Sequence, residues 1–120
     1  MSGGSVLVVD DDPDIRIFVE TILAEEGIEA VVAPDAKEAL RRLGERCFDL
    51  LLTDIRMPGA DGFELVQQAR RAYPELRVLF MSGYSREYRL DPERDEFVAK
   101  PFRPRELLGC VYEILGRGRG

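Results

Sequence analysis

Five short apolar runs alternate along the chain with segments in which apolar residues recur three and four positions apart. Short, nearly continuous apolar runs are typical of strands with both faces covered, and the intervening spacing is typical of amphipathic helices. This alternation predicts an α/β domain with a doubly wound parallel sheet and helices on both of its faces. The predicted strands are residues 6–10, 29–33, 48–54, 76–82 and 96–100.

Acidic residues mark the expected starts of the first three helices. Asp12 is suited to cap the first helix, with Pro13 at the first helical position, and Gly27 is expected to end that helix. The next two helices are predicted to begin with capping boxes: Asp35 with Glu38, and Asp61 with Glu64. A last helix is expected from about Pro104.

The segment between the fourth and fifth strands departs from the regular alternation. Residues 83–96 carry little helical periodicity, and Pro92 stands near their middle. Proline removes a backbone donor and clashes with the preceding turn of a helix. The fourth helix is therefore predicted to be short or irregular.

Length and composition define the organisation of the chain. A length of 120 residues predicts one domain, and 45% hydrophobic with 33% charged residues indicate a globular protein. We expect residues 1–5 to be a linker or tag, residues 6–115 the domain, and residues 116–120 a flexible tail. The sequence has no apolar run of ~18 residues and no signal-peptide pattern, so a cytoplasmic location is expected.

Charge and residue types exclude several classes of function. A formal net charge of −6 argues against direct binding of nucleic acid or of an anionic membrane, because phosphate binding needs clustered Lys and Arg. The chain has no histidine, which excludes a histidine nucleophile, base or metal ligand within it. Cys47 and Cys110 match no metal or redox spacing, and we expect them to be buried free thiols.

Polar residues stand where the predicted strands end, which is the edge where doubly wound sheets bind their ligands. The first strand ends in Asp10 and Asp11, the third in Asp54, the fourth in Ser82 and the fifth in Lys100. Two carboxylates ~4 Å apart repel by about 4 kcal/mol at an effective dielectric constant of about 20, so they stay ionised only beside cations. One divalent ion together with Lys100 would neutralise the three acids. An all-oxygen ligand set favours Mg²⁺.

Other interpretations of the acidic run "DDDPD" fit less well. An EF-hand loop would need glycine where Ile15 stands and glutamate where Thr21 stands. A nucleotide-binding turn would need a glycine-rich phosphate cradle, which this turn lacks. Acids that merely complement a helix dipole account for Asp12 and Asp14, but not for the matching acid and lysine at other strand ends.

Four motifs stand in a characteristic order and spacing: "VLVVDDDPD", "LLLTDIRMPGADG", "VLFMSGY" and "FVAKPF". Together they resemble the receiver domain of two-component response regulators, over about residues 6–115. The stretch "MSGYS" also resembles receivers that are fused to hybrid histidine kinases. The resemblance implies a flavodoxin-like (βα)5 fold with five parallel strands in the order 2-1-3-4-5.

The resemblance also implies a metal site around a phosphoacceptor. Asp54 would accept the phosphoryl group. Asp10 and Asp11 would hold Mg²⁺ together with Asp54 and the backbone carbonyl of Arg56.

Three further residues take roles by resemblance. Lys100 would pair with the incoming phosphoryl oxygens, and the Lys100–Pro101 bond is expected to be cis. Ser82 would hydrogen-bond to an oxygen of the attached phosphoryl group. Phe97 occupies the position of a switch aromatic residue, and a role as switch or as core residue is equally expected.

The implied partner is a histidine kinase, because the phosphodonor would be a phosphohistidine and this chain has none of its own. The domain would catalyse only its own phosphorylation and dephosphorylation, without turnover as an enzyme. Its output would pass through contacts with a downstream protein, and a homodimer is compatible with the family.

Two alternative functions stay open at this point. A haloacid-dehalogenase-like aspartate phosphatase would use Asp10 and Asp12, but Asp14 stands where that motif has Thr or Val, and there is little room for a cap. A receiver-like interaction module that is not phosphorylated would keep the fold. The intact set of acids, serine and lysine argues against it.

Overall fold

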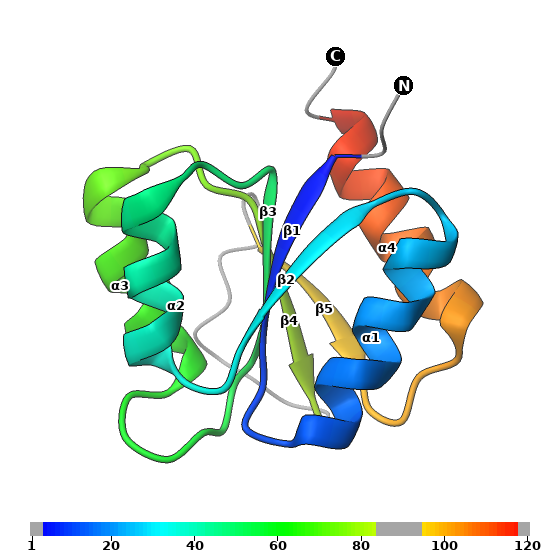
Figure 1. Cartoon of the computed structure of the whole chain (residues 1–120), viewed down its shortest axis with the longest axis horizontal. Helices are drawn as coiled ribbons and strands as arrows, with labels where there is room; N and C mark the ends of the chain where they lie inside the picture. The colour runs from blue at the N-terminus through cyan, green and yellow to red at the C-terminus, as the bar shows by residue number, and fades with distance from the viewer. Residues whose placement is uncertain (1–3, 84–94, 118–120) are drawn as a thin grey trace.

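A five-stranded parallel sheet forms the centre of the protein in the computed structural model, which describes residues 4–83 and 95–117 (Figure 1). The strands are β1 (Ser5–Val9), β2 (Glu29–Ala33), β3 (Leu50–Asp54), β4 (Val78–Ser82) and β5 (Asp95–Ala99). The described helices are α1 (Pro13–Glu25), α2 (Ala36–Glu45), α3 (Gly62–Ala72) and α4 (Pro104–Arg117). The strand order is β2-β1-β3-β4-β5 with all neighbours parallel, which confirms the flavodoxin-like fold.

Two helical layers cover the two faces of this sheet. Figure 1 shows α2 and α3 on one side and α1 and α4 on the other. Successive residues of β1 alternate between the layers: Leu7 and Val9 pack with the core under α2 and α3, whereas Val6 and Val8 pack with the core under α1 and α4. This is why the central strands are nearly continuous apolar runs. None of the helices described here is long and apolar enough to cross a bilayer.

The helix starts follow the predicted caps with one exception. The caps of α1 and α3 are confirmed: the Asp12 side chain, and the reciprocal Asp61–Glu64 capping box. At α2, Asp35 accepts a hydrogen bond from the Glu38 amide at 2.8 Å, as predicted. The Glu38 carboxylate does not complete the box, because it forms an ion pair with Arg41 at 2.6 Å on the exposed face of the helix.

Some element bounds differ from the predicted ones. β1 begins at Ser5, within the predicted linker, and the Ser5 amide donates a hydrogen bond to the Asp49 carboxylate at 2.8 Å. α4 continues to Arg117, into the predicted tail. The prediction of a short or irregular fourth helix falls on residues 84–94, which lie outside the described residues.

The prediction of buried thiols is wrong at one of the two cysteines. Cys47 is exposed, because Phe48 takes the buried position between α2 and β3. The guanidinium of Arg46 covers the Phe48 ring at 4.8 Å from its centroid. Cys110 is half-buried in α4, and both thiols are free.

β5 begins one residue earlier than predicted, at a buried ion pair. Asp95 lies 2.9 Å from Arg70 of α3, and their side chains are only 4% and 10% exposed. The same guanidinium donates a hydrogen bond to the Leu76 carbonyl at 2.9 Å. Removing one partner of a buried pair typically costs about 3–5 kcal/mol. The pair therefore ties the edge strand β5 to α3.

The first residue of α3 lies against the backbone at the end of β3. The Gly62 amide donates a hydrogen bond to the Ile55 carbonyl at 2.8 Å. A Cβ at position 62 would lie 2.3 Å from the carbonyl oxygen of Asp54, well inside van der Waals contact. Glycine is the residue that permits this approach, so the start of α3 and the end of β3 are held as one unit.

We expect Gly62→Ala to lower the free energy of unfolding by about 1–3 kcal/mol, because the added methyl group overlaps the Asp54 carbonyl. Gly109→Ala is the matched control, since an added Cβ at this exposed position of α4 meets nothing within 4 Å. Because alanine has a higher helix propensity than glycine, Gly109→Ala should raise the free energy of unfolding by about 0.5–1 kcal/mol. Denaturant unfolding of both variants measures the difference, and equal stabilities would contradict the close approach.

Candidate phosphoacceptor and metal site

Three carboxylates meet at the carboxyl end of the sheet. Asp10 and Asp11 directly follow β1, and Asp54 is the last residue of β3. β1 and β3 are neighbouring strands, and Val9 lies opposite Thr53. One carboxylate oxygen of each acid lies within 4.8 Å of the other two. The structure thus brings together the three acids that the sequence places at strand ends.

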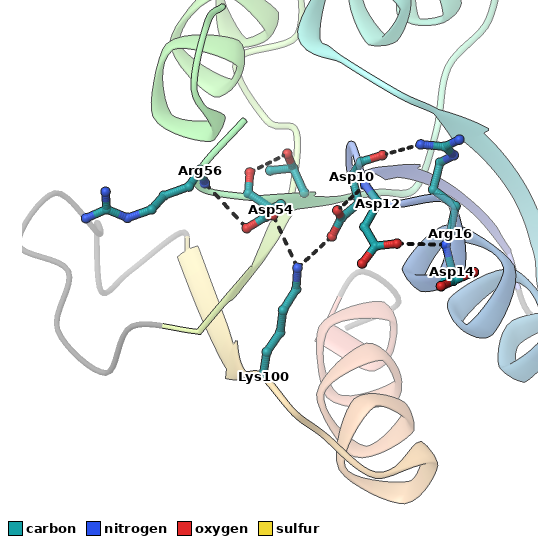
Figure 2. A network of polar contacts seen from close by, with 8 residues as sticks. Asp10, Asp12, Asp14, Arg16, Asp54, Arg56 and Lys100 are labelled. Atoms are coloured by element: carbon teal, nitrogen blue, oxygen red, sulfur yellow. Dashed lines mark hydrogen bonds and ion pairs between the residues drawn. The ribbon is translucent and has the colours of Figure 1, made fainter. Parts of the chain in front are cut away.

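Lys100 supplies a positive charge to this cluster from the end of β5. Its backbone amide donates a hydrogen bond to the Ser82 carbonyl at 2.7 Å, and the Lys100–Pro101 bond is cis, as the resemblance implies. The ammonium lies 2.7 Å from Asp10 Oδ2 and 3.2 Å from Asp54 Oδ2 (Figure 2). One cation therefore bridges acids from two different strands.

Asp54 is buried, with a relative exposure of only 8%. Its Oδ2 faces Lys100, and its Oδ1 accepts a long hydrogen bond of 3.4 Å from the Arg56 amide. The Thr53 hydroxyl donates to the Asp54 backbone carbonyl at 2.9 Å. The side chain of Asp54 is thus fixed by Lys100 and the Arg56 amide, and its backbone carbonyl by Thr53.

The site shifts the protonation equilibria of two groups. Burial raises the pKa of the Asp54 carboxyl, the charge of Asp10 raises it further, and Lys100 acts in the opposite direction. Burial by itself would lower the pKa of the Lys100 ammonium, but the hydrogen bond to Asp10 and the charges of both acids raise it overall. Lys100 is therefore charged at neutral pH. The ionised form of Asp54 lowers the stability of the folded domain, because the pKa of this carboxyl is raised on folding.

The donor set fits a hard divalent cation. All three groups that could hold a metal are carboxylates, and the chain has no histidine to favour a softer metal. Three carboxylates beside one ammonium leave two negative charges, which one divalent ion would offset. Mg²⁺ prefers oxygen ligands and keeps several waters, so a partly exposed cluster such as this one suits it.

Ser82 and Arg56 lie at the same carboxyl end of the sheet, whereas Phe97 lies in the middle of β5. Ser82 ends β4, the strand next to β3, and is 1% exposed. Arg56 follows Asp54 by two residues, and Figure 2 shows its side chain extending away from Lys100. The metal-binding role of its carbonyl stays a prediction. Phe97 is half-buried in β5 against the core under α2 and α3, and its role as a switch also stays a prediction.

Three residues that contact the site have no place in the sequence prediction. Arg16 donates from Nη1 to the Asp10 carbonyl at 2.7 Å. Thr53 and Gly62 both lie against the Asp54 carbonyl. The position of Arg16 in the first turn of the helix that follows the acids is a signal from which its contact with them could have been predicted. The close approach of Gly62 has no such signal.

Comparison with known proteins assigns this arrangement to a family. A model of the response regulator receiver domain matches residues 6–112 of the chain. The chain belongs to this family. The response regulator receiver protein CpdR of Brucella abortus strain 2308 is 34% identical over 115 residues, which cover 92% of this chain and 95% of CpdR. The resemblance drawn from the four motifs is confirmed.

Solved receiver structures share the fold of this receiver domain. The response regulator TrrA of Thermotoga maritima, solved in complex with Mg²⁺ and BeF, has a TM-score of 0.83 at 35% identity, over 95% of this chain and 99% of TrrA. The receiver domain of the hybrid histidine kinase CckA has a TM-score of 0.83 at 32% identity, over 93% of this chain and 99% of that domain. Both are similar along nearly their whole length.

Asp54→Asn is expected to stabilise the metal-free receiver domain at neutral pH by roughly 0.5–2 kcal/mol, because it removes a carboxylate that burial and Asp10 disfavour. The pKa of Asp54 is raised in the folded state, so the wild type regains this stability as the pH falls through that pKa. The advantage of the variant should therefore shrink on acidification. Urea unfolding of both proteins across the acidic range measures it.

Glu75→Gln is the matched control for this comparison, since it removes the same charge from an exposed position. Glu75→Gln should change the free energy of unfolding by less than about 0.5 kcal/mol, both at neutral pH and in the acidic range. A destabilised, metal-free Asp54→Asn protein at neutral pH would contradict the account of the site.

Proposed function

We propose that this receiver domain accepts a phosphoryl group on Asp54 from the phosphohistidine of a histidine kinase, in a reaction that depends on Mg²⁺. The observation that carries the proposal is the setting of Asp54, which lies 3.2 Å from the Lys100 ammonium and within 4.8 Å of the acids that follow β1. Phosphoryl transfer requires mainly positioning and charge neutralisation. The site offers both.

In the proposed reaction, a carboxylate oxygen of Asp54 attacks the phosphorus atom. The bond from phosphorus to this oxygen forms as the bond from phosphorus to the donor imidazole nitrogen breaks, and that nitrogen keeps the electron pair. Lys100 would pair with the phosphoryl oxygens and balance their charge. The Ser82 hydroxyl, at the end of the neighbouring strand, would donate a hydrogen bond to the attached group.

The residues proposed to hold the metal are Asp10, Asp11 and Asp54 with the carbonyl of Arg56. When bound, Mg²⁺ supplies charge neutralisation at the oxygens of the transferring group. The fit of the three carboxylates to a hard cation supports this assignment. So does the similarity to TrrA, which was solved in complex with Mg²⁺ and BeF.

The proposed role of phosphorylation is to change the contacts of the domain with a downstream protein. The chain has no histidine, so the phosphohistidine would lie on a separate kinase domain. Water would later hydrolyse the acyl phosphate and end the signal. The domain would thus act as a phosphoacceptor and not as an enzyme with turnover on small phosphate esters.

Mg²⁺ should raise the melting temperature of the domain, because it binds the folded state in preference to the unfolded one. At 100 times Kd the expected gain is about 2.7 kcal/mol. Asp11→Asn should reduce this gain by removing one ligand charge. Asp12→Asn is the control: asparagine caps a helix as well as aspartate does, and Asp12 lies outside the acid cluster. A wild type with no shift in Mg²⁺ would contradict the metal site.

A small phosphodonor such as acetyl phosphate, with Mg²⁺, should add the mass of one phosphoryl group to the wild type. Asp54→Asn should abolish the addition, because the nucleophilic oxygen is lost, and Asp12→Asn should retain it. Intact-protein mass spectrometry makes the measurement. The proposal fails if saturating donor and metal leave the wild type unmodified. Multiple turnovers on a generic phosphate ester would instead favour the haloacid-dehalogenase-like phosphatase.

A further inference from the structure

Asp10 is fully buried and is held at each of its polar atoms. Its amide donates to the Ala33 carbonyl at 3.2 Å, and its Oδ1 accepts from the Asp12 amide at 2.9 Å. Its Oδ2 accepts from Lys100 at 2.7 Å, and its backbone carbonyl accepts from Arg16 Nη1 at 2.7 Å (Figure 2). Four neighbours thus fix one residue of the acid cluster.

Asp11 is placed quite differently. It is exposed, and within residues 4–83 and 95–117 its carboxylate forms no hydrogen bond or ion pair. One of its oxygens nevertheless lies within 4.8 Å of ligand atoms of Asp10 and Asp54. Its position therefore depends on the backbone that carries it. The oxygen of the Asp10–Asp11 peptide group is the atom that Arg16 contacts.

The geometry of the first turn of α1 brings Arg16 to this peptide group. The Asp12 side chain caps the helix, and the Arg16 amide donates to the Asp12 carbonyl at 3.1 Å. The Asp10 carbonyl lies beyond Val9, the last paired residue of β1, so it has no partner in the sheet ladder. A buried carbonyl needs a hydrogen-bond donor, and the always-charged guanidinium is a strong one.

We propose that Arg16 is a positioning residue of the metal site. By holding the Asp10 carbonyl, it orients the peptide group between Asp10 and Asp11, and so keeps the Asp11 carboxylate beside Asp54. This inference rests on the proposed function, because it concerns Mg²⁺ at the same cluster.

The direction in which the loss of Arg16 changes the affinity for Mg²⁺ distinguishes a positioning role from a purely electrostatic one. A guanidinium near the acids repels a divalent cation, so its charge alone opposes binding. Removing Arg16 would then tighten the binding of Mg²⁺. Positioning has the opposite consequence, because an unfixed Asp11 must be ordered each time that the ion binds.

The test is calorimetric titration of the full chain with MgCl₂. Arg16→Met should weaken binding about 10–100-fold, the usual loss when the partner behind a metal ligand is removed. Arg16→Lys keeps the charge and one donor, and should recover part of the affinity. Arg71→Met removes the same charge from an exposed position in the last turn of α3 and is the matched control. It should stay within about twofold of the wild type, since distant charges are screened by salt.

Equal or tighter binding of Mg²⁺ by Arg16→Met would overturn the inference. A merely structural role would lower the melting temperature without metal and leave Kd unchanged, which would also overturn it. Circular dichroism without metal shows whether each variant is folded, and Arg16→Gln replaces Arg16→Met if the latter is not. A wild type that binds no Mg²⁺ would reject the proposed metal site itself, whereas unchanged Arg16 variants of a binding wild type would reject the positioning role alone.

Discussion

The contact of the Lys100 ammonium with Asp10 and Asp54 is the interaction on which the site depends. Adjacent strands β1 and β3 force two carboxylates together, and burial makes their repulsion more costly. β5 neighbours neither of these strands, because β4 lies between β3 and β5. The lysine side chain therefore reaches past the end of β4. The ion pairs of Lys100 with Asp10 and Asp54 thus link the edge strand β5 to the ends of the inner strands β1 and β3.

Much of this arrangement is predictable from local patterns. Apolar runs indicate strands covered on both faces, and the order of strands and helices indicates a parallel sheet. In such a sheet all carboxyl ends lie on the same side, so acids that end the first and third strands converge once these strands are neighbours. Caps depend on contacts within one turn, which is why those at Asp12 and Asp61 follow directly from the sequence. The strand order itself came from the resemblance to the receiver family.

What the sequence does not indicate depends on contacts between distant elements. The Arg70–Asp95 pair joins α3 to the edge strand, and no periodicity reports that two charged residues share a buried place. In the half-formed Asp35–Glu38 capping box, the Glu38 carboxylate pairs with Arg41 and not with the backbone amide of Asp35. The spacing of the residues alone cannot predict which of the two partners it takes. The approach of Gly62 to the Asp54 backbone depends on how helix and strand pack together. Periodicity assigns residues to a face but does not identify their partners.

The acid cluster has an inner half and an outer half with different freedom to change. Asp10 is built into the protein interior through four neighbours, so replacing it disturbs several elements together. Asp11 stands at the surface, and its carboxylate is not tied to another side chain of the described chain. A substitution at Asp11 can therefore change the charge and the side-chain length at the outer part of the cluster, while the contacts that hold Asp10 are kept.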